Sequence, residues 1–171
     1  CVERDAVTWG GQLSSIEPAL VIAASHGSGH RQSSSVLFPA QSGAELFRAA
    51  ATYTIEQLEK LRVPILIIEP LIEVVTDPLF CLSGARFIDE CEIISRPITP
   101  DKEIIQSLVR DHSGAFSADP SPILACSDFG GCPAMIEGVV VRRDKGHLTV
   151  DFAKANADWL WNEMQNTGTF G

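Results

Sequence analysis

The stretch Pro18-Ala-Leu-Val-Ile-Ala-Ala-Ser-His-Gly-Ser-Gly29 decides the fold that the sequence predicts. Residues 19–24 are a continuous apolar run of strand length, and the small and polar residues from Ser25 onward do not prolong it. Continuous apolarity, unlike alternation, indicates a strand that is covered on both faces. Such strands occur in parallel sheets between layers of helices, so this segment predicts an α/β protein.

Outward from this strand, predicted helices and strands alternate. Ser42 and Glu45 form a capping box that opens a helix closed by Arg62, and residues 63–68 form a second buried strand. Thr99-Pro100-Asp101 is a strong helix start, because it offers a cap, a proline and an acid in the right order. We also expect short strands at residues 91–95 and 122–126, a hairpin around residues 143–146, and a last helix capped by Asp151.

This order of elements predicts a three-layer sandwich with a mainly parallel sheet and helices on both faces, followed by a C-terminal hairpin and helix. The length of 171 residues suits a single α/β domain over residues 1–171. There are 22 acidic residues against 13 basic ones, for a net charge of −9, which argues against binding to nucleic acid or to an anionic membrane. The apolar runs are far shorter than the roughly 20 residues that span a bilayer.

The cysteines form an odd set in which no pair has the CxxC spacing of zinc sites: Cys1, Cys81, Cys91, Cys126 and Cys132. We therefore expect no metal, mostly free thiols and a reducing, cytoplasmic location. The chain begins with cysteine instead of methionine and shows no signal peptide. We therefore expect a fragment or a processed chain, with a second chain or with an upstream segment that was removed.

Reactive residues follow two of the predicted strands. Ligands of parallel sheets bind beyond the carboxyl ends of the strands, and His26 and Cys126 both lie at such ends. An imidazole that takes the proton of a thiol makes a nucleophilic thiolate, so this pair predicts a Cys–His dyad. The supporting candidates, which offer backbone N–H groups or polar side chains beside the pair, are Ser25, Gly27, Asp128 and Gly130.

Structural roles remain open for the same residues. Cysteine is among the most buried residue types, so Cys126 is also expected as a small core residue. His26 would then cap its loop, and Cys132, which follows the glycines, competes as the more exposed thiol.

These two segments resemble the caspase-like cysteine peptidase superfamily, which includes gingipains and separases. The resemblance rests on Ala-Ser-His-Gly at residues 24–27 and on Leu-Ala-Cys-x-x-x-Gly-Gly at residues 124–131. It implies an endopeptidase with His26 as base and Cys126 as nucleophile, acting on a peptide or protein substrate without a cofactor. In that superfamily the two strands follow one another through one crossover, whereas residues 63–68 intervene here, so a catalytically inactive relative stays open.

Two other classes of function use different features. The glycine- and serine-rich segment Ser25–Ser35 offers donors to a phosphate, as in a flavodoxin-like domain that binds FMN or a nucleotide. It matches neither GxGxxG nor GxxxxGK[ST]. A non-catalytic interaction module would use exposed tryptophans, with Trp9, Trp159 and Trp161 as candidates.

Overall fold

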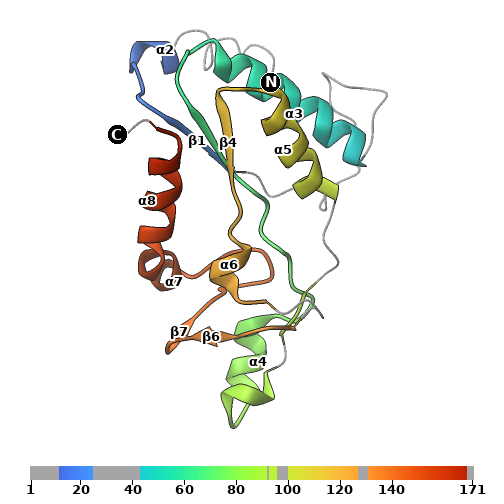
Figure 1. The fold of residues 1–171 in the computed structure, drawn as a ribbon. Coiled ribbons are helices and arrows are strands. Elements are labelled where there is room, and N and C mark those ends of the chain that lie inside the picture. The colour runs from blue at the N-terminus through green and yellow to red at the C-terminus, as the bar shows by residue number, and fades with distance from the viewer. Residues whose placement is uncertain (1–11, 25–42, 92, 96–99, 127–130, 169–171) are drawn as a thin grey trace. The chain divides into compact units, whose positions relative to one another are not determined.

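The computed structural model describes residues 12–24, 43–91, 93–95, 100–126 and 131–168 (Figure 1). The chain packs as two compact units. The first unit comprises Cys1–Pro70, Thr99–Ala118 and Met164–Gly171, and the second comprises Leu71–Ile98 and Asp119–Glu163. The expectation of one domain over residues 1–171 stays a prediction.

The first unit contains a sheet of three parallel strands in the order β1–β2–β4. These strands are β1 (Val21–Ala24), β2 (Ile65–Ile68) and β4 (Ala115–Ala118). In the register of the sheet, Val21 pairs with Ile65, and Ile65 pairs with Ala115. The expected strands within residues 19–24 and 63–68 are therefore present, and an α/β fold with a small parallel sheet is confirmed.

The strands differ in how deeply they are buried. In the described part of the chain β1 pairs only with β2, and its side chains alternate in exposure, with Ile22 at 43%. The prediction that residues 19–24 are covered on both faces is therefore wrong. Strand β2 lies between two neighbours, and Ile65, Leu66 and Ile67 are all buried. A continuous apolar run therefore indicates burial on both faces for β2 but not for β1.

Two helices cover one face of this sheet. They are α3 (Gly43–Glu59) and α5 (Pro100–Asp111), which lie beside each other in Figure 1. Both share one core with Ile65 and Ile67, which point to the same face of β2 because they are two positions apart. Since the connections β1–α3–β2 and β2–α5–β4 advance in the same direction across the sheet, right-handed crossovers place both helices on the same side.

The core of the first unit forms between these helices and β2. Its buried members are Ile55, Leu58, Ile65, Ile67, Ile104, Ile105 and Leu108. The spacing of these residues along α3 and α5 is that of one helical face. On the opposite face of the sheet, Leu66 is buried as well.

The second unit is built from short elements. They are α4 (Pro78–Gly84), a 3-10 turn η2 (Ile88–Glu90), β3 (Ile93–Ile94), α6 (Ser121–Leu124), β5 (Gly131–Cys132), β6 (Met135–Ile136), β7 (Val139–Val140) and α7 (Val150–Ala155). Strand β3 pairs antiparallel with β5, and β6 pairs antiparallel with β7. Helix α8 (Ala157–Asn166) follows α7, and a short helix α2 (Leu13–Ser15) precedes β1.

The C-terminal hairpin and helix occur with shifted boundaries. The hairpin strands are β6 and β7, whereas the turn at residues 143–146 is flanked by a single antiparallel bridge between Arg142 and Leu148. Helix α7 is capped by Thr149, whose hydroxyl accepts a hydrogen bond from the backbone N–H of Phe152. The prediction of Asp151 as the cap is wrong, because Thr149 already occupies that position and Asp151 lies in the first turn.

Among the described residues, no helix has both the length and the apolar character needed to cross a bilayer.

Candidate functional site

Cys126 follows a helical turn and not a strand. Asp119 accepts a hydrogen bond from the backbone N–H of Ser121 at 2.9 Å, and Pro122 stands in the first turn of α6. Ala125 then adopts a left-handed conformation with φ 48°, which ends the helix. These are ordinary helix-start and helix-stop features, so the strand predicted at residues 122–126 is wrong.

The cysteines are paired in the described chain. Cys126 forms a disulfide with Cys132 in β5, and their Cα atoms are 4.1 Å apart. Cys81 forms a second disulfide with Cys91, at a Cα separation of 5.6 Å. The prediction of mostly free thiols is therefore wrong for four of the five cysteines. Pairing depends on which residues meet in space, and sequence spacing does not report that.

The disulfides change the chemistry expected at Cys126. A thiolate is the attacking species in thiol catalysis, and a sulfur held in a disulfide cannot supply one. Cys126 therefore becomes a nucleophile only after its bond to Cys132 is reduced. The predicted cytoplasmic location was based on free thiols, whereas disulfides persist mainly in oxidising compartments. The location itself stays a prediction.

The remaining predicted site residues lie outside the described residues. They are Ser25, His26, Gly27, Asp128 and Gly130. The distance between the His26 imidazole and the Cys126 sulfur therefore stays a prediction. The segment Ser25–Ser35 and Trp9 also lie outside, whereas Trp159 is half-buried and Trp161 is exposed.

A buried carboxylate stands where β2 ends. Glu69 follows the last residue of this strand, is 3% exposed, and donates its backbone N–H to the carbonyl of Ala118 at 2.9 Å. Gln106 of α5 donates to both carboxylate oxygens, at 3.2 and 3.3 Å. Lys102, one helical turn earlier, places Nζ 3.6 Å from Oε2. Glu69 is thus held by both an amide and an ammonium group.

This arrangement satisfies a charge that would otherwise be costly to bury. Because both oxygens of Glu69 are engaged, the group fastens α5 to the central strand at the edge where ligands of parallel sheets bind. The sequence patterns did not identify Glu69 as a functional candidate. The available signal was an acidic residue placed directly after a fully apolar strand, in Ile65-Leu-Ile-Ile-Glu69.

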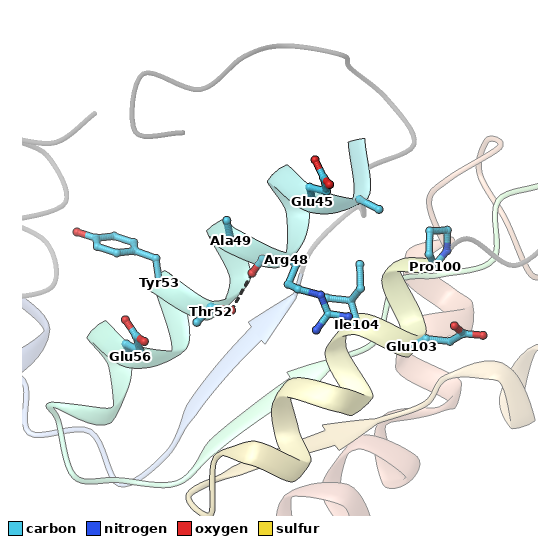
Figure 2. A pocket seen from close by; sticks show the side chains of 10 residues that line it. Glu45, Arg48, Ala49, Thr52, Tyr53, Glu56, Pro100, Glu103 and Ile104 are labelled. Carbon is cyan, nitrogen blue, oxygen red and sulfur yellow. Dashed lines mark hydrogen bonds between the residues drawn. The ribbon is translucent and has the colours of Figure 1, made fainter. Parts of the chain in front are cut away.

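An open groove of about 800 Å³ runs between α3 and α5 (Figure 2). Glu45, Arg48 and Glu56 line it from α3, and Glu103 and Ile104 line it from α5. In Figure 2 the side chain of Arg48 extends toward α5, beside Ile104. The sequence could not indicate this groove, because two helices that are distant in the chain form it together.

The turn at residues 143–146 holds a strongly acidic carboxyl group. Burial raises the pKa of Asp144, but hydrogen bonds from the backbone N–H groups of Gly146 and His147 and from the His147 ring outweigh it and lower the pKa to about 2. Asp144 is therefore ionised at every pH above the acid range. It stabilises the predicted turn by accepting hydrogen bonds from the residues that follow it.

In the described part of the chain, no three His, Cys, Asp or Glu side chains are grouped so that they could hold a metal ion.

No protein-family model, curated protein or solved structure matches this chain.

Proposed function

We propose that the protein is a cysteine peptidase of the caspase-like kind, inactive while Cys126 is bonded to Cys132 and active after reduction. His26 acts as the base and Cys126 as the nucleophile. The observation that carries the proposal is the parallel pairing of β1 and β4 with β2. Both strands therefore end at the same edge of the sheet. In the sequence, His26 follows the end of β1 by two residues, and Cys126 follows the end of β4 by eight.

The proposed fold is a three-layer sandwich of the caspase-like kind with this sheet as its middle layer. Two observations support it. Helices α3 and α5 cover the face of the sheet that bears Ile65 and Ile67. Leu66, on the opposite face of β2, is 1% exposed and is thus covered as well.

Activation requires a reductant, and a dithiol supplies the two electrons. One thiolate of the dithiol attacks a sulfur of the Cys126–Cys132 bond, which forms a mixed disulfide and releases one cysteine. The second thiolate of the dithiol then attacks the dithiol sulfur of this mixed disulfide and releases the other cysteine. The products are two cysteine thiols and an oxidised dithiol. His26 takes the proton from the Cys126 thiol, and the sulfur attacks the carbonyl carbon of the peptide bond.

The remaining steps return the enzyme to its starting state. The backbone N–H groups of Gly27 and Gly130 stabilise the oxyanion that forms on the carbonyl oxygen. The imidazolium of His26 gives its proton to the leaving amine, which leaves a thioester on Cys126. Water, deprotonated by His26, hydrolyses the thioester, releases the carboxylic acid and restores the thiol.

The test compares cleavage of a peptide library by the full chain with and without dithiothreitol. Cleavage is expected only with the reductant, and it should be lost in Cys126→Ala and His26→Ala. The matched variant Cys132→Ser frees the Cys126 thiol and should cleave without reductant. A double Cys81→Ser, Cys91→Ser variant is the control, because it removes the other disulfide and should keep the reductant dependence.

Two outcomes would overturn this function. One is cleavage that persists in Cys126→Ala. The other is a folded Cys132→Ser variant that is as inactive as Cys126→Ala under all redox conditions, tested across the same peptide library.

A non-catalytic interaction module is the second candidate, and one observation favours it. The segment around the Cys81–Cys91 disulfide exposes four large apolar side chains, Leu79, Phe80, Phe87 and Ile88, with Phe80 at 81%. Exposed apolar residues that lie close together on a soluble surface are typical of contact sites.

The first partner to test for this module is a second copy of the chain. Sedimentation velocity over a range of concentrations should then show self-association that Phe80→Ser weakens and that a His26→Ala, Cys126→Ala double variant leaves intact. A chain that stays monomeric up to high concentration would exclude this form of the module.

A further inference from the structure

Arg142 is the one buried cation of the described chain that has no partner on its terminal nitrogens. The residue is 1% exposed, and it lies directly after Val141 in the bridge to Leu148. Both Nη atoms are shielded from solvent, and neither has a hydrogen-bond partner in the described part of the protein. They are the only buried side-chain nitrogen or oxygen atoms of the described residues that lack a partner.

The buried positive charge of Arg142 is not removed by loss of a proton. Burial lowers the pKa of Arg142, and the negative charge of Asp144 partly opposes that shift. Arginine nevertheless stays protonated in proteins, so the charge remains. A buried charge without a partner is strongly destabilising, and natural structures offset it with a counter-ion.

Asp144 does not serve as that counter-ion through a hydrogen bond. Its carboxylate accepts from the backbone N–H groups of Gly146 and His147 and from the His147 ring, and it lies 3.5 Å from Nε of Arg143. Both Nη groups of Arg142 therefore lack an acceptor among the described residues.

We propose that Arg142 anchors a buried binding site for one small monocarboxylate. The two Nη groups of a guanidinium form a planar fork that matches the two oxygens of a carboxylate. The site is separate from the proposed peptidase residues and does not depend on them.

The charge of the surroundings selects a monoanion. One guanidinium balances one negative charge, and the other basic side chains of this turn are exposed, namely those of Arg143 and Lys145. A phosphate dianion would therefore bring an unbalanced negative charge into the interior. The shielding of both Nη atoms also favours a ligand of a few heavy atoms that enters when the unit opens locally.

The experiment is thermal unfolding of the full chain at about pH 8.5, where phosphate is chiefly a dianion, in sodium acetate, sodium propionate or sodium phosphate, each against sodium chloride at equal ionic strength. Acetate or propionate should raise Tm with a saturating dependence, by about 5 °C or more at 100-fold excess over Kd. Phosphate should do no more than chloride. A larger rise in phosphate than in either carboxylate would overturn the assignment of a monocarboxylate.

Two variants locate the effect. Arg142→Met should raise Tm in chloride, because it removes an unpaired buried charge, and should abolish the response to carboxylate. Arg143→Met, which removes the exposed neighbouring cation, should keep the response. An equal response in the wild type and in Arg142→Met, or no response in the wild type, would overturn the proposal.

A second measurement does not depend on folding of a variant. The guanidinium Nε resonance of Arg142 in the wild-type protein should shift as acetate is added, with that of Arg143 as the internal control. A resonance of Arg142 that does not move would count against the site in the same way.

Discussion

The side-chain amide of Gln106 lies 3.2 and 3.3 Å from the two carboxylate oxygens of Glu69, which ties helix α5 to the end of the central strand. Both residues belong to the first unit, and Lys102 adds an ion pair to the same carboxylate. The contact joins residues that are 37 positions apart in the chain. It therefore contributes to the packing of the helix on the sheet and not to the stability of either element alone.

Replacing Glu69 should destabilise the first unit. Glu69→Ala removes the carboxylate that accepts from the Gln106 amide and pairs with Lys102, so we expect a loss of about 2–4 kcal/mol in the free energy of unfolding. Glu69→Gln keeps the volume and part of the hydrogen bonding and should cost about 1–2 kcal/mol.

Urea denaturation followed by circular dichroism measures this loss. The control is Glu103→Gln, an exposed acid of the same helix, which should change the unfolding free energy by less than about 0.5 kcal/mol. Equal effects of Glu69→Ala and Glu103→Gln would show that the buried cluster adds nothing to stability.

The cap of helix α7 is a second measurable contribution. Thr149→Ala removes the acceptor for the Phe152 N–H and the hydroxyl that donates to the carbonyl of Val140, and it should cost about 1–2 kcal/mol. Asp151 is the cap that the sequence predicts. Its replacement, Asp151→Ala, should cost less than about 0.5 kcal/mol. Chemical denaturation of both variants decides between the two caps, and a larger cost for Asp151→Ala would contradict the observed geometry.

Asp144 should make stability depend on acid. Its pKa is lowered to about 2 in the folded protein, below the value of roughly 3.9 expected when unfolded. A carboxyl with a lowered folded pKa contributes stability that is fully present above the unfolded pKa and is lost as the pH falls through the folded pKa. We therefore expect the advantage of the wild type over Asp144→Asn to be fully present at about pH 5.

That advantage should shrink steadily between about pH 4 and pH 2. The measurement is the free energy of unfolding of both proteins at several pH values by denaturant titration. Asp77→Asn, which changes a carboxylate that caps α4, is a comparison variant for the second unit. A difference between wild type and Asp144→Asn that does not vary with pH would contradict the assignment.

The Cys81–Cys91 disulfide should stabilise the second unit. It closes a short loop with a sequence separation of 10, for which chain entropy predicts roughly 2–3 kcal/mol. The double variant Cys81→Ser, Cys91→Ser should lose about that amount. Cys91 also packs against Val74 and Ile93 in the core of this unit, so its replacement by serine adds to the loss.

Hydrogen exchange of the same variant tests the division into two units. Protection should fall in residues 71–98 and 119–163 and stay unchanged in β2 of the first unit. A uniform loss of protection across both units would show that they unfold as one cooperative body.

Much of the first unit could be predicted because its signals are local. The apolar run that contains β2 and the Thr99-Pro100-Asp101 start of α5 correspond to elements with nearly the expected boundaries. The prediction failed at residues 122–126, where five apolar or small residues suit either a strand or a helical turn. The hydrogen bond from the backbone N–H of Ser121 to the Asp119 carboxylate favours the helical turn. The apolar run by itself predicts a strand, because it does not include this acidic residue before it.

The candidate site could be predicted only as a set of residue types. Cys126 and His26 are apparent from the sequence as reactive side chains that follow apolar segments. The bond between Cys126 and Cys132, the burial of Glu69 beside Gln106 and the isolation of Arg142 are not apparent. Each depends on a partner, or on a missing partner, that the chain places there only when it folds.

The amino-acid sequence by itself determined the α/β character of this protein, because apolar continuity and helix starts act through neighbouring residues along the chain. Tertiary structure alone decided which strand became central, which thiols were joined and which charges were neutralised. The physical reason is that burial, disulfide bonds and ion pairs are set by distance in space, and short-range patterns in the chain carry no measure of that distance.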